Sequence, residues 1–355
     1  MPRLRRSDCS SPGLARLRQG EGFTYVDADG ETITDPEDLT RVAELGIPPA
    51  WKDVWICPDD RGHLQATGID AAGRKQYLYH PQWRTRRDNE KFEEMTRFAR
   101  ALPALREHVD AHMTGTDRLT RERVLACAVR LLDRGFFRVG SEQYMAQNES
   151  FGLATMRKRH VTLDPDHCGM VFDYKAKSGK RRIQGLVDPA AFEVVAALKR
   201  RRGGGNELLA YKNGRAWVDV RAADINEYLH DATGDDDFTA KDFRTWAATM
   251  LAAIALAVSG EVANTPTGRK RAVARAVKEV SHYLGNTPAV CRASYIDPRV
   301  IDAYNGGLII RGVLQEIADT AEPGELPIHR PALEQAVLDL LNKREASPAL
   351  ERVAA

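Results

Sequence analysis

The sequence predicts an α+β protein with a small β-rich N-terminal domain, residues 1–88, followed by a larger and mainly helical domain, residues 89–355. Two patterns predict this division. Short runs of β-forming residues, separated by turn signals such as Asp29-Gly30, fill the first part of the chain. Apolar residues that recur every three and four positions dominate the second part. A length of 355 residues suits two domains.

The composition is that of an ordinary globular protein, with 43% hydrophobic and 29% charged residues. No run of about 18 apolar residues predicts a membrane span, and the arginines near the start lead into no apolar signal core. The five cysteines are scattered and never in C-x-x-C spacing, which argues against disulfides and zinc. We therefore expect a cytoplasmic protein with reduced cysteines, no membrane association and no cofactor.

The net charge of +2 conceals an uneven distribution of charge. Residues 21–60 contain eleven acidic and two basic side chains, whereas residues 155–182 contain eight basic and three acidic ones. Such a separation suits a polyanion on one side of the molecule, although a solvated charged surface produces the same pattern.

The N-terminal domain is predicted to begin with a β-hairpin formed by residues 23–26 and 31–34 around Asp29-Gly30. Further turn signals at Asp60-Arg61-Gly62 and Ala71-Ala72-Gly73 predict additional strands.

One of these strands, residues 74–80, carries basic, aromatic and amide side chains. Because side chains alternate along a strand, Lys75, Tyr77 and Tyr79 share one face and Gln76 lies on the other. Glutamine can pair with adenine and lysine can neutralise a phosphate, so the strand is a candidate DNA contact. The alternative is that the tyrosines pack a two-sided sheet.

The second domain is predicted to contain helices over residues 89–101, 120–135 and 142–147, the last one capped by Ser141. Arg138 stands just before this cap between apolar residues. That position half-buries the guanidinium and directs it at an anion, although a salt bridge is the alternative role.

A β-hairpin is predicted next, with strands at residues 161–163 and 171–174, a Ser178-Gly179 turn and a return strand at residues 181–183. Lys175 ends the second of these strands, and Lys177 and Lys180 lie on the same hairpin.

The longest helix is predicted to start after Thr239, to extend to Val258 and to be closed by Gly260. Its apolar stretch predicts a core helix, with Arg244 in the first turn. One more amphipathic helix is predicted after Ala321.

The Gly285-Asn286-Thr287-Pro288 run must interrupt a helix, because proline lacks the N–H and restricts the residue before it. We expect a helix over residues 268–284, another from Pro298, and Tyr295 on a short helix or turn between them. Tyr295 is therefore a candidate nucleophile, with a packing role as the alternative.

Taken together, Arg138, Lys175, Arg244, Asn286 and Tyr295 resemble the catalytic set of the type IB DNA topoisomerases, in their poxvirus-like and bacterial branch. The resemblance covers the chain from about residue 22 to residue 321. It rests on five motifs that occur in the family's order: Gln76-Tyr77-Leu78-Tyr79, Phe137-Arg138-Val139-Gly140, Phe172-Asp173-Tyr174-Lys175, Lys241-Asp242-Phe243-Arg244-Thr245, and Gly285-Asn286-Thr287-Pro288 with Ser294-Tyr295.

The resemblance implies a DNA-relaxing isomerase that uses neither ATP nor metal. Tyr295 would form a covalent 3′-phosphotyrosyl intermediate, and Arg138 and Arg244 would hold the phosphoryl oxygens. Lys175 would protonate the leaving oxygen, and Asn286 would donate a hydrogen bond to the phosphoryl group.

The same resemblance implies a monomeric, C-shaped clamp around double-stranded DNA, a catalytic fold related to the tyrosine recombinases and a location at the bacterial nucleoid. The residues implied to contact DNA are Lys75, Gln76, Tyr77, Tyr79, Tyr144 and Lys241.

Two departures from the poxvirus pattern stand out. Asn286 occupies the position of a histidine, and an amide cannot carry charge. The helix from Ser141 lacks lysines of the viral helix although Tyr144 matches, so the viral pentameric target preference does not carry over.

Two alternative functions remain open. A tyrosine recombinase or integrase shares the Arg-Lys-Arg-Tyr chemistry, but recombinases usually place histidine where this chain has Lys241. A non-catalytic DNA clamp that retains the fold is the other alternative.

Overall fold

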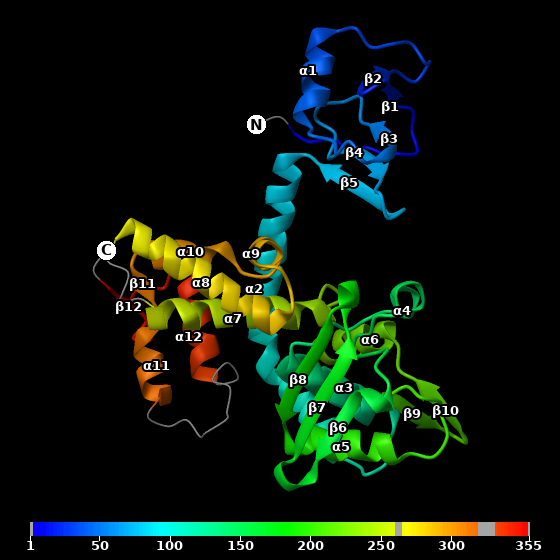
Figure 1. Ribbon diagram of the computed structural model, residues 1–355. Helices are drawn as coiled ribbons and strands as arrows, with labels where there is room; N and C mark the ends of the chain where they lie inside the picture. Colours follow the sequence, from blue (N-terminus) through cyan, green and yellow to red (C-terminus); the bar gives the residue numbers. More distant parts are fainter. Residues whose placement is uncertain (1–2, 260–264, 319–330, 354–355) are drawn as a thin grey trace. The chain divides into compact units, whose positions relative to one another are not determined.

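The computed structural model describes residues 3–259, 265–318 and 331–353. The chain divides into two compact units, one up to Phe92 and one from Glu93 onward. The first unit contains a sheet and the second is mainly helical (Figure 1). The predicted α+β organisation is therefore confirmed at this level.

The first unit is a five-stranded antiparallel sheet in the order β2-β1-β3-β4-β5, accompanied by helix α1. Its small core contains Val42 from the helix and Val54, Ile56 and Ala66 from central strands, and Leu78 of β5 packs against it. The elements are β1 (Leu14–Gln19), β2 (Gly22–Val26), α1 (Pro36–Glu44), β3 (Lys52–Ile56), β4 (Leu64–Ile69) and β5 (Lys75–Tyr79).

The predicted first hairpin forms only in part. β2 pairs along its length with the preceding strand β1 around Gly20, whose φ of 57° suits the tight turn. Residues 31–34 contribute an isolated antiparallel bridge between Val26 and Thr32, with backbone hydrogen bonds of 2.9 Å from Asp27 to Glu31 and from Ile33 to Tyr25. The Asp29-Gly30 turn does form, but the Asp27 carboxylate accepts the backbone N–H groups of Asp29 and Glu31 and makes a local Asx-type loop instead of a ladder.

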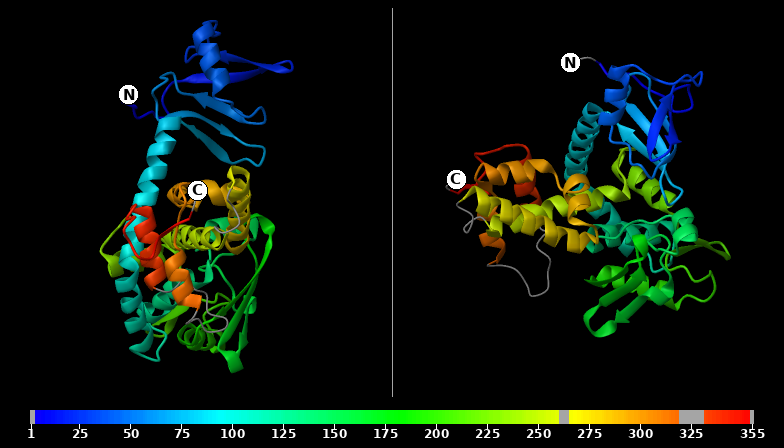
Figure 2. Two further views of the ribbon diagram at one scale, coloured as in Figure 1. Left: turned by 90° about the vertical axis from the view of Figure 1, so that its left-hand side faces the viewer. Right: turned by 45° about the horizontal axis from the view of Figure 1, so that its top comes forward.

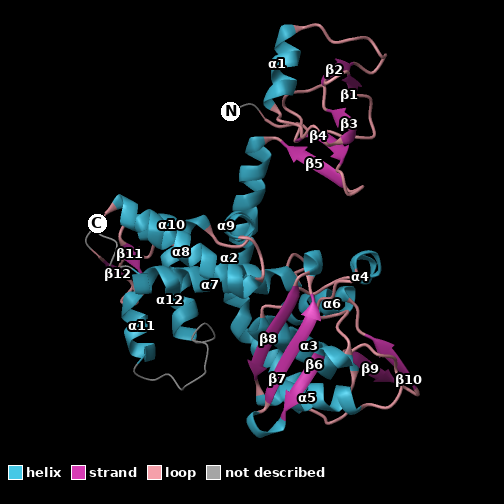
Figure 3. Ribbon diagram, viewed as in Figure 1, coloured by secondary structure: helices cyan, strands magenta, loops and turns pink. Residues whose placement is uncertain are grey.

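Helices make up most of the second unit (Figure 1, Figure 3). Helix α2 begins in the first unit, and its 34 residues make it the longest described helix. The helices are α2 (Pro81–Thr114), α3 (Arg121–Gly135), α4 (Glu142–Asn148), α5 (Pro189–Arg200), α6 (Ala222–Thr233), α7 (Ala240–Ser259), α8 (Pro266–Leu284), α9 (Pro288–Ser294), α10 (Pro298–Asn305), α11 (Arg311–Ala318) and α12 (Pro331–Leu341).

Three of the helix predictions need correction. The segment predicted over residues 89–101 belongs to α2, which continues through Pro103. The core helix α7 has 20 residues and is not the longest, and Gly260 lies outside the described residues. Helix α12 is buried at most positions, so it is a packed helix and not an amphipathic one.

The predicted hairpin is confirmed as part of a three-stranded antiparallel sheet, in the order β6-β7-β8 (Figure 3). Ser178 and Gly179 both adopt positive φ at its turn. Two short strand pairs complete the second unit. The strands are β6 (Val161–Asp164), β7 (Gly169–Lys175), β8 (Arg181–Val187), β9 (Ala210–Asn213), β10 (Ala216–Asp219), β11 (Leu308–Ile309) and β12 (Glu351–Arg352).

Helix α7 is the centre of the second unit. It packs against α3, α8 and α10, and α8 runs beside it (Figure 1, Figure 2). Most of its residues are buried, including Arg244 and Trp246. No described helix is long and apolar enough to cross a bilayer.

Candidate active site

The break between α8 and α9 sets the backbone of the site. Gly285 adopts a φ of +61° and its N–H bonds to the carbonyl of His282 at 3.1 Å, while the N–H of Asn286 bonds to the carbonyl of Ser281 at 3.0 Å. This is a Schellman ending, which needs the left-handed conformation that glycine adopts without strain. The predicted interruption of the helix at this point is confirmed.

A new helix starts immediately afterwards. Thr287 caps α9 by accepting the N–H of Val290, and Pro288 occupies the first turn. Tyr295 follows the last residue of α9, and its N–H bonds to the carbonyl of Cys291 at 3.0 Å. Two consecutive capping motifs thus fix both Asn286 and Tyr295 relative to α8.

Three arginines converge on the carbonyl end of α8. Arg244 donates to the carbonyl of Leu284 at 2.9 Å, and Arg138 donates to that of Gly285 at 3.0 Å. Arg182 of β8 donates to the carbonyl of Tyr283. A helix C-terminus carries partial negative charge, so the three cations are held where the dipole favours them.

Arg244 is the most deeply buried of the three, with 3% of its surface exposed. It also donates to the carbonyl of Phe136, just past the end of α3. Its Nε is buried and has no hydrogen-bond partner among the described residues. Arg244 therefore has a donor left for an anion while its outer nitrogens are fixed by backbone carbonyls.

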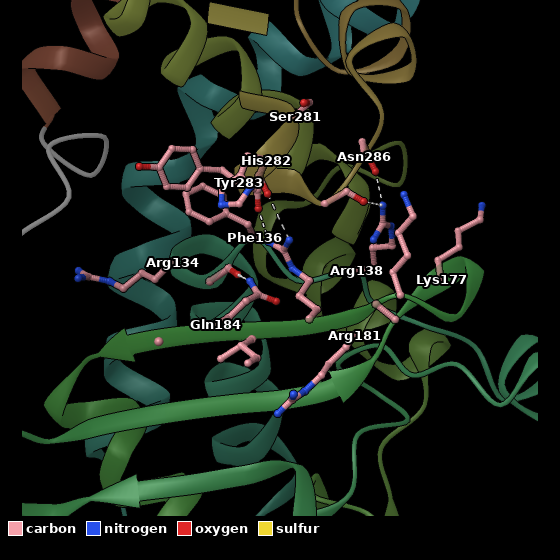
Figure 4. Close-up of a pocket in the computed structure, with 17 residues that line it drawn as sticks. Arg134, Phe136, Arg138, Lys177, Arg181, Gln184, Ser281, His282, Tyr283 and Asn286 are labelled. Atoms are coloured by element: carbon pink, nitrogen blue, oxygen red, sulfur yellow. Dashed lines mark hydrogen bonds between the residues drawn. The ribbon is translucent and has the colours of Figure 1, made fainter. Parts of the chain in front are cut away.

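Arg138 and Asn286 are in direct contact. The guanidinium of Arg138 donates to Oδ1 of Asn286, as a dashed line in Figure 4 marks. The Nδ2 group of Asn286 is buried and, within the described part of the chain, has no partner. A second unused donor therefore stands beside the first arginine.

Tyr295 opens into a cavity of about 270 Å³. The guanidinium carbon of Arg244 lies 5.3 Å from the centre of the tyrosine ring, within the range of a cation–π contact. The charged and hydroxyl-bearing side chains that line the cavity are Arg138, Ser141, Tyr144, Ser150, Lys177, Lys241, Arg244 and Tyr295.

Electrostatics prepare the phenol for ionisation. Burial raises the pKa of Tyr295, but the positive charges of Arg244, Arg138 and Lys241 outweigh it and hold the pKa below its ordinary value. Burial, together with the charge of Arg138, lowers the pKa of Arg244 to about 10, so the guanidinium remains protonated at neutral pH. The site thus makes the phenol easier to ionise than an ordinary tyrosine, next to a permanent cation.

Comparisons with known proteins agree with this geometry. The family model of the eukaryotic DNA topoisomerase I catalytic core matches residues 80–308, and that of the bacterial DNA topoisomerase IB N-terminal domain matches residues 22–70. The chain belongs to the type IB DNA topoisomerases. The resemblance predicted from the five motifs is confirmed.

Viral DNA topoisomerases are among the relatives of this chain. The chain is 30% identical to the DNA topoisomerase 1B of Acanthamoeba polyphaga mimivirus over 307 residues, covering 82% of this chain and 87% of the relative. It is 19% identical over 290 residues to the DNA topoisomerase I of Monkeypox virus and to the DNA topoisomerase 1B of Vaccinia virus (strain Copenhagen), covering 77% of this chain and 87% of each relative.

The hairpin lysines of this type IB topoisomerase are divided between different surroundings. Lys175 is about half exposed, forms a 3.6 Å ion pair with Glu149 and does not line the Tyr295 cavity. Lys177 does line that cavity, and Lys180 lines a neighbouring one. The residue matched to the general acid is thus not the hairpin lysine nearest the tyrosine pocket.

A neighbouring cavity, of about 500 Å³, shares Arg138 and Lys177 with the Tyr295 cavity, and Figure 4 shows the residues that line it. Asn286 lines this cavity and not that of Tyr295. Of the five predicted catalytic residues, the structure therefore gathers Arg138, Arg244 and Tyr295 in one pocket, with Asn286 joined through Arg138.

The residues predicted to contact DNA lie partly in the second unit and partly in the first. Tyr144 and Lys241 line the Tyr295 cavity. In the first unit, Tyr77 and Tyr79 are exposed and their rings stack at 6.2 Å, with Lys75 beside Tyr77. Gln76 faces the other way and its amide donates to Asp70 at 2.9 Å.

Arg182 is the site residue that motif reasoning missed. In the sequence it was only one of eight basic groups between residues 155 and 182. The available signal was strand alternation: on the return strand, residues 182, 184 and 186 face away from solvent while 181, 183, 185 and 187 are exposed. A half-buried arginine on such a strand requires partners.

Proposed function

We propose that this chain relaxes supercoiled double-stranded DNA by cutting one strand, holding it as a 3′-phosphotyrosyl intermediate on Tyr295 and resealing it, without ATP or metal. Membership of the type IB DNA topoisomerases supports the activity. The observation that carries the mechanism is the pocket shared by Tyr295, Arg138 and Arg244.

In the cleavage step, the Tyr295 phenolate attacks the scissile phosphorus. The bond between Oη and phosphorus forms as the bond to the 5′-oxygen breaks, and negative charge accumulates on the two non-bridging oxygens. Arg138 and Arg244 stabilise that charge, and each such donor contributes about 10²- to 10³-fold in rate. Arg244 has a second role, because its charge helps keep the phenol ionised.

Two unused donors support a phosphoryl group at this place. Nε of Arg244 and Nδ2 of Asn286 are both buried without a hydrogen-bond partner among the described residues. Leaving a buried donor unpaired costs about 1–3 kcal/mol. A bound phosphodiester offers acceptor oxygens that would satisfy both donors.

The leaving 5′-oxygen must take a proton, and we assign that proton to Lys175. Its ion pair with Glu149 joins two exposed side chains, 47% and 87% accessible. Such a pair contributes about 0–1 kcal/mol, so DNA can displace it at little cost. The hairpin turn is polar and carries two residues with positive φ, which suits a segment that adjusts when DNA docks.

Resealing is the reverse reaction. The free 5′-hydroxyl attacks the phosphotyrosine, the bond between phosphorus and Oη breaks, and Tyr295 is regenerated. The phosphotyrosyl bond conserves the energy of the original phosphodiester, so no nucleotide hydrolysis is needed. Rotation of the free end between the two steps removes supercoils.

We assign DNA contacts to both units and propose that a single chain acts as a C-shaped clamp. The exposed face of β5, with Lys75, Tyr77 and Tyr79, combines a cation with stacked aromatic rings. Tyr144 and Lys241 supply a polar ring and a cation beside the reacting tyrosine.

The test is relaxation of a plasmid without recombination sites, in a chelating buffer and without ATP. The wild-type chain should relax it and leave a DNA adduct that survives denaturant. Tyr295→Phe, which lacks only the nucleophilic oxygen, should lose both while still binding DNA. Strand exchange confined to particular sites would instead indicate a recombinase, and unchanged behaviour of Tyr295→Phe would indicate a non-catalytic clamp.

A further inference from the structure

Arg182 occupies a position that the catalytic scheme does not use. It lies on β8 directly opposite Tyr174 of β7, and its guanidinium extends to the end of α8. Nη2 donates to the carbonyl of Tyr283, and Nη1 approaches that of His282 at 3.4 Å. It therefore links the hairpin sheet to the helix that carries Asn286 at its end.

The carbonyl groups at the end of α8 explain why an arginine is needed there. The Schellman bonds satisfy the carbonyls of residues 281 and 282 and leave those of residues 283 and 284 without intrahelical partners, and the carbonyl of Gly285 follows just past the helix. Arg182, Arg244 and Arg138 donate to the carbonyls of residues 283, 284 and 285 in turn, and Arg182 also reaches the carbonyl of residue 282. Without Arg182 the carbonyl of residue 283 would lose its donor. It lies next to the carbonyls bound by Arg244 and Arg138, the two arginines that we assign to the phosphate.

Arg182 also fixes the position of the glycine before Asn286. A Cβ atom on Gly285 would lie 2.6 Å from Nη1 of Arg182, so the guanidinium packs directly on the backbone at that point. The next residue is Asn286, which accepts a hydrogen bond from Arg138. A displacement at Gly285 would be transmitted to both groups.

A second chain of hydrogen bonds connects the same strand to Arg244. The hydroxyl of Tyr174 donates to Gln184 at 2.8 Å, and the amide of Gln184 donates to the carbonyl of Gly135. The following carbonyl, that of Phe136, accepts from Arg244. The hairpin sheet is thus connected by hydrogen bonds to the end of α8 through Arg182 and to the end of α3, where Arg244 is bound, through Gln184.

The partners of Arg182 are backbone carbonyl groups at the end of α8 and not a carboxylate. No carboxylate in the described part of the chain forms an ion pair with it. Its exposed neighbour Arg181 does have such a partner, Asp173. Burial lowers the pKa of Arg182, and the nearby charge of Arg138 lowers it further. Tyr174 and the carbonyl groups at the end of α8 compensate the charge of Arg182 in place of a carboxylate, so the side chain is fixed to the end of that helix.

We propose that Arg182 is a positioning residue that holds the end of α8, and through it Asn286, in the geometry required for cleavage. The inference rests on the proposed function and adds a residue that does not itself touch the DNA. Misplacement of catalytic groups by about 1 Å costs on the order of 10²-fold in rate.

The test is a double-mutant cycle measured by single-turnover cleavage of a duplex from which the released strand dissociates. Arg182→Gln should slow cleavage about 10- to 100-fold while the Kd for DNA stays within twofold of wild type. Combining it with Asn286→Ala should be little slower than Asn286→Ala alone, because both changes act on the same group. Arg181→Gln, on the same strand and the other face, is the matched control and should cleave at the wild-type rate.

Other outcomes would overturn the proposal. If the rate losses of the two single variants multiply in the double variant, Arg182 acts independently of Asn286. If Arg182→Gln binds DNA more weakly and its affinity depends less on salt, Arg182 is a direct phosphate contact. Wild-type cleavage by Arg182→Gln would leave it no role in the reaction. If Arg182→Gln does not fold, as a thermal melt would reveal, Arg182→Lys serves in its place: it keeps the charge but cannot span two carbonyls, and it should show the same coupling. If the wild-type chain forms no adduct, the proposed function itself fails.

Discussion

The guanidinium of Arg244 lies 5.3 Å from the centre of the Tyr295 ring, on a helix that is almost wholly buried. The cation is held by the backbone carbonyls of Phe136 and Leu284 and so cannot move away from the tyrosine. One residue can therefore both lower the pKa of the nucleophile and stabilise the charge that its attack creates.

The first prediction concerns the fork geometry of Arg244. Arg244→Lys keeps a positive charge but loses the planar set of donors, so cleavage should fall about 10²- to 10³-fold with little change in DNA affinity. Single-turnover cleavage and a binding titration check this. Arg201→Lys is the control, because Arg201 is also buried and donates to backbone carbonyls but lies outside the site. It should lower the melting temperature and leave the cleavage rate of the folded protein unchanged.

The second prediction concerns pH. The phenolate is the nucleophile, so cleavage should rise with pH until the lowered pKa of Tyr295 is passed. Lys241→Gln removes one of the charges that lower this pKa, so the rise should move to higher pH and the rate should recover in alkaline buffer. Lys241→Arg should keep the wild-type profile. A profile that drops equally at every pH would show that Lys241 acts through binding alone.

The third prediction separates the hairpin lysines. A sulfur in place of the leaving 5′-oxygen needs no proton, because thiols ionise near pH 8.5. Lys175→Ala should therefore be slow on ordinary DNA, by about 10²- to 10⁴-fold, and restored on the sulfur-containing substrate. Lys177→Ala should show a smaller defect on both. Rescue of Lys177→Ala and not of Lys175→Ala would transfer the acid role to the lysine that lines the tyrosine cavity.

The fourth prediction concerns Asn286. A histidine here can be protonated, and a charged donor makes a hydrogen bond about twice as strong as a neutral one. Asn286→His should accelerate cleavage a few-fold near pH 6 and lose that gain near pH 8. Asn286→Ala, which removes the donor, should be slow at both pH values. Equal rates for the alanine and wild-type proteins would exclude a contact between Asn286 and the phosphoryl group.

The fifth prediction distinguishes stability from catalysis at Gly285. Gly285→Ala must strain a residue at φ +61° and also meets Arg182 at 2.6 Å. Gly234 ends α6 with a similar φ of +68°, but an alanine side chain there would contact nothing. Both alanine variants should lose about 1–2 kcal/mol of unfolding free energy, measured by denaturant titration, because L-residues are strained in this conformation. Only Gly285→Ala should also slow cleavage.

Several features of this protein could be predicted from local sequence. The Gly285 to Pro288 run ends one helix and starts the next because the conformations of glycine, threonine and proline decide those boundaries locally. The hairpin of β7 and β8 followed from its Ser178-Gly179 turn in the same way. Family motifs then identified Arg138, Arg244 and Tyr295, and the structure gathers these three in one pocket.

Other features depend on contacts between distant parts of the chain. The partner of β2 is the strand before it and not the one after Gly30, because strand pairing depends on which register buries a common face. The interior of α2 passes Pro103 because packing outweighs the local penalty. Neither choice can be read from a short window of residues.

The sequence by itself determined the family and singled out the candidate nucleophile and two candidate arginines, because motifs in a fixed order record the chemistry of the family's reaction. Only the tertiary structure decided which backbone carbonyl groups hold those arginines in place. The carbonyl end of α8 needs three donors, and the third comes from Arg182, a residue about 100 positions earlier on a different element. Such a requirement arises from orphan backbone groups in three dimensions, which leave no motif in the sequence.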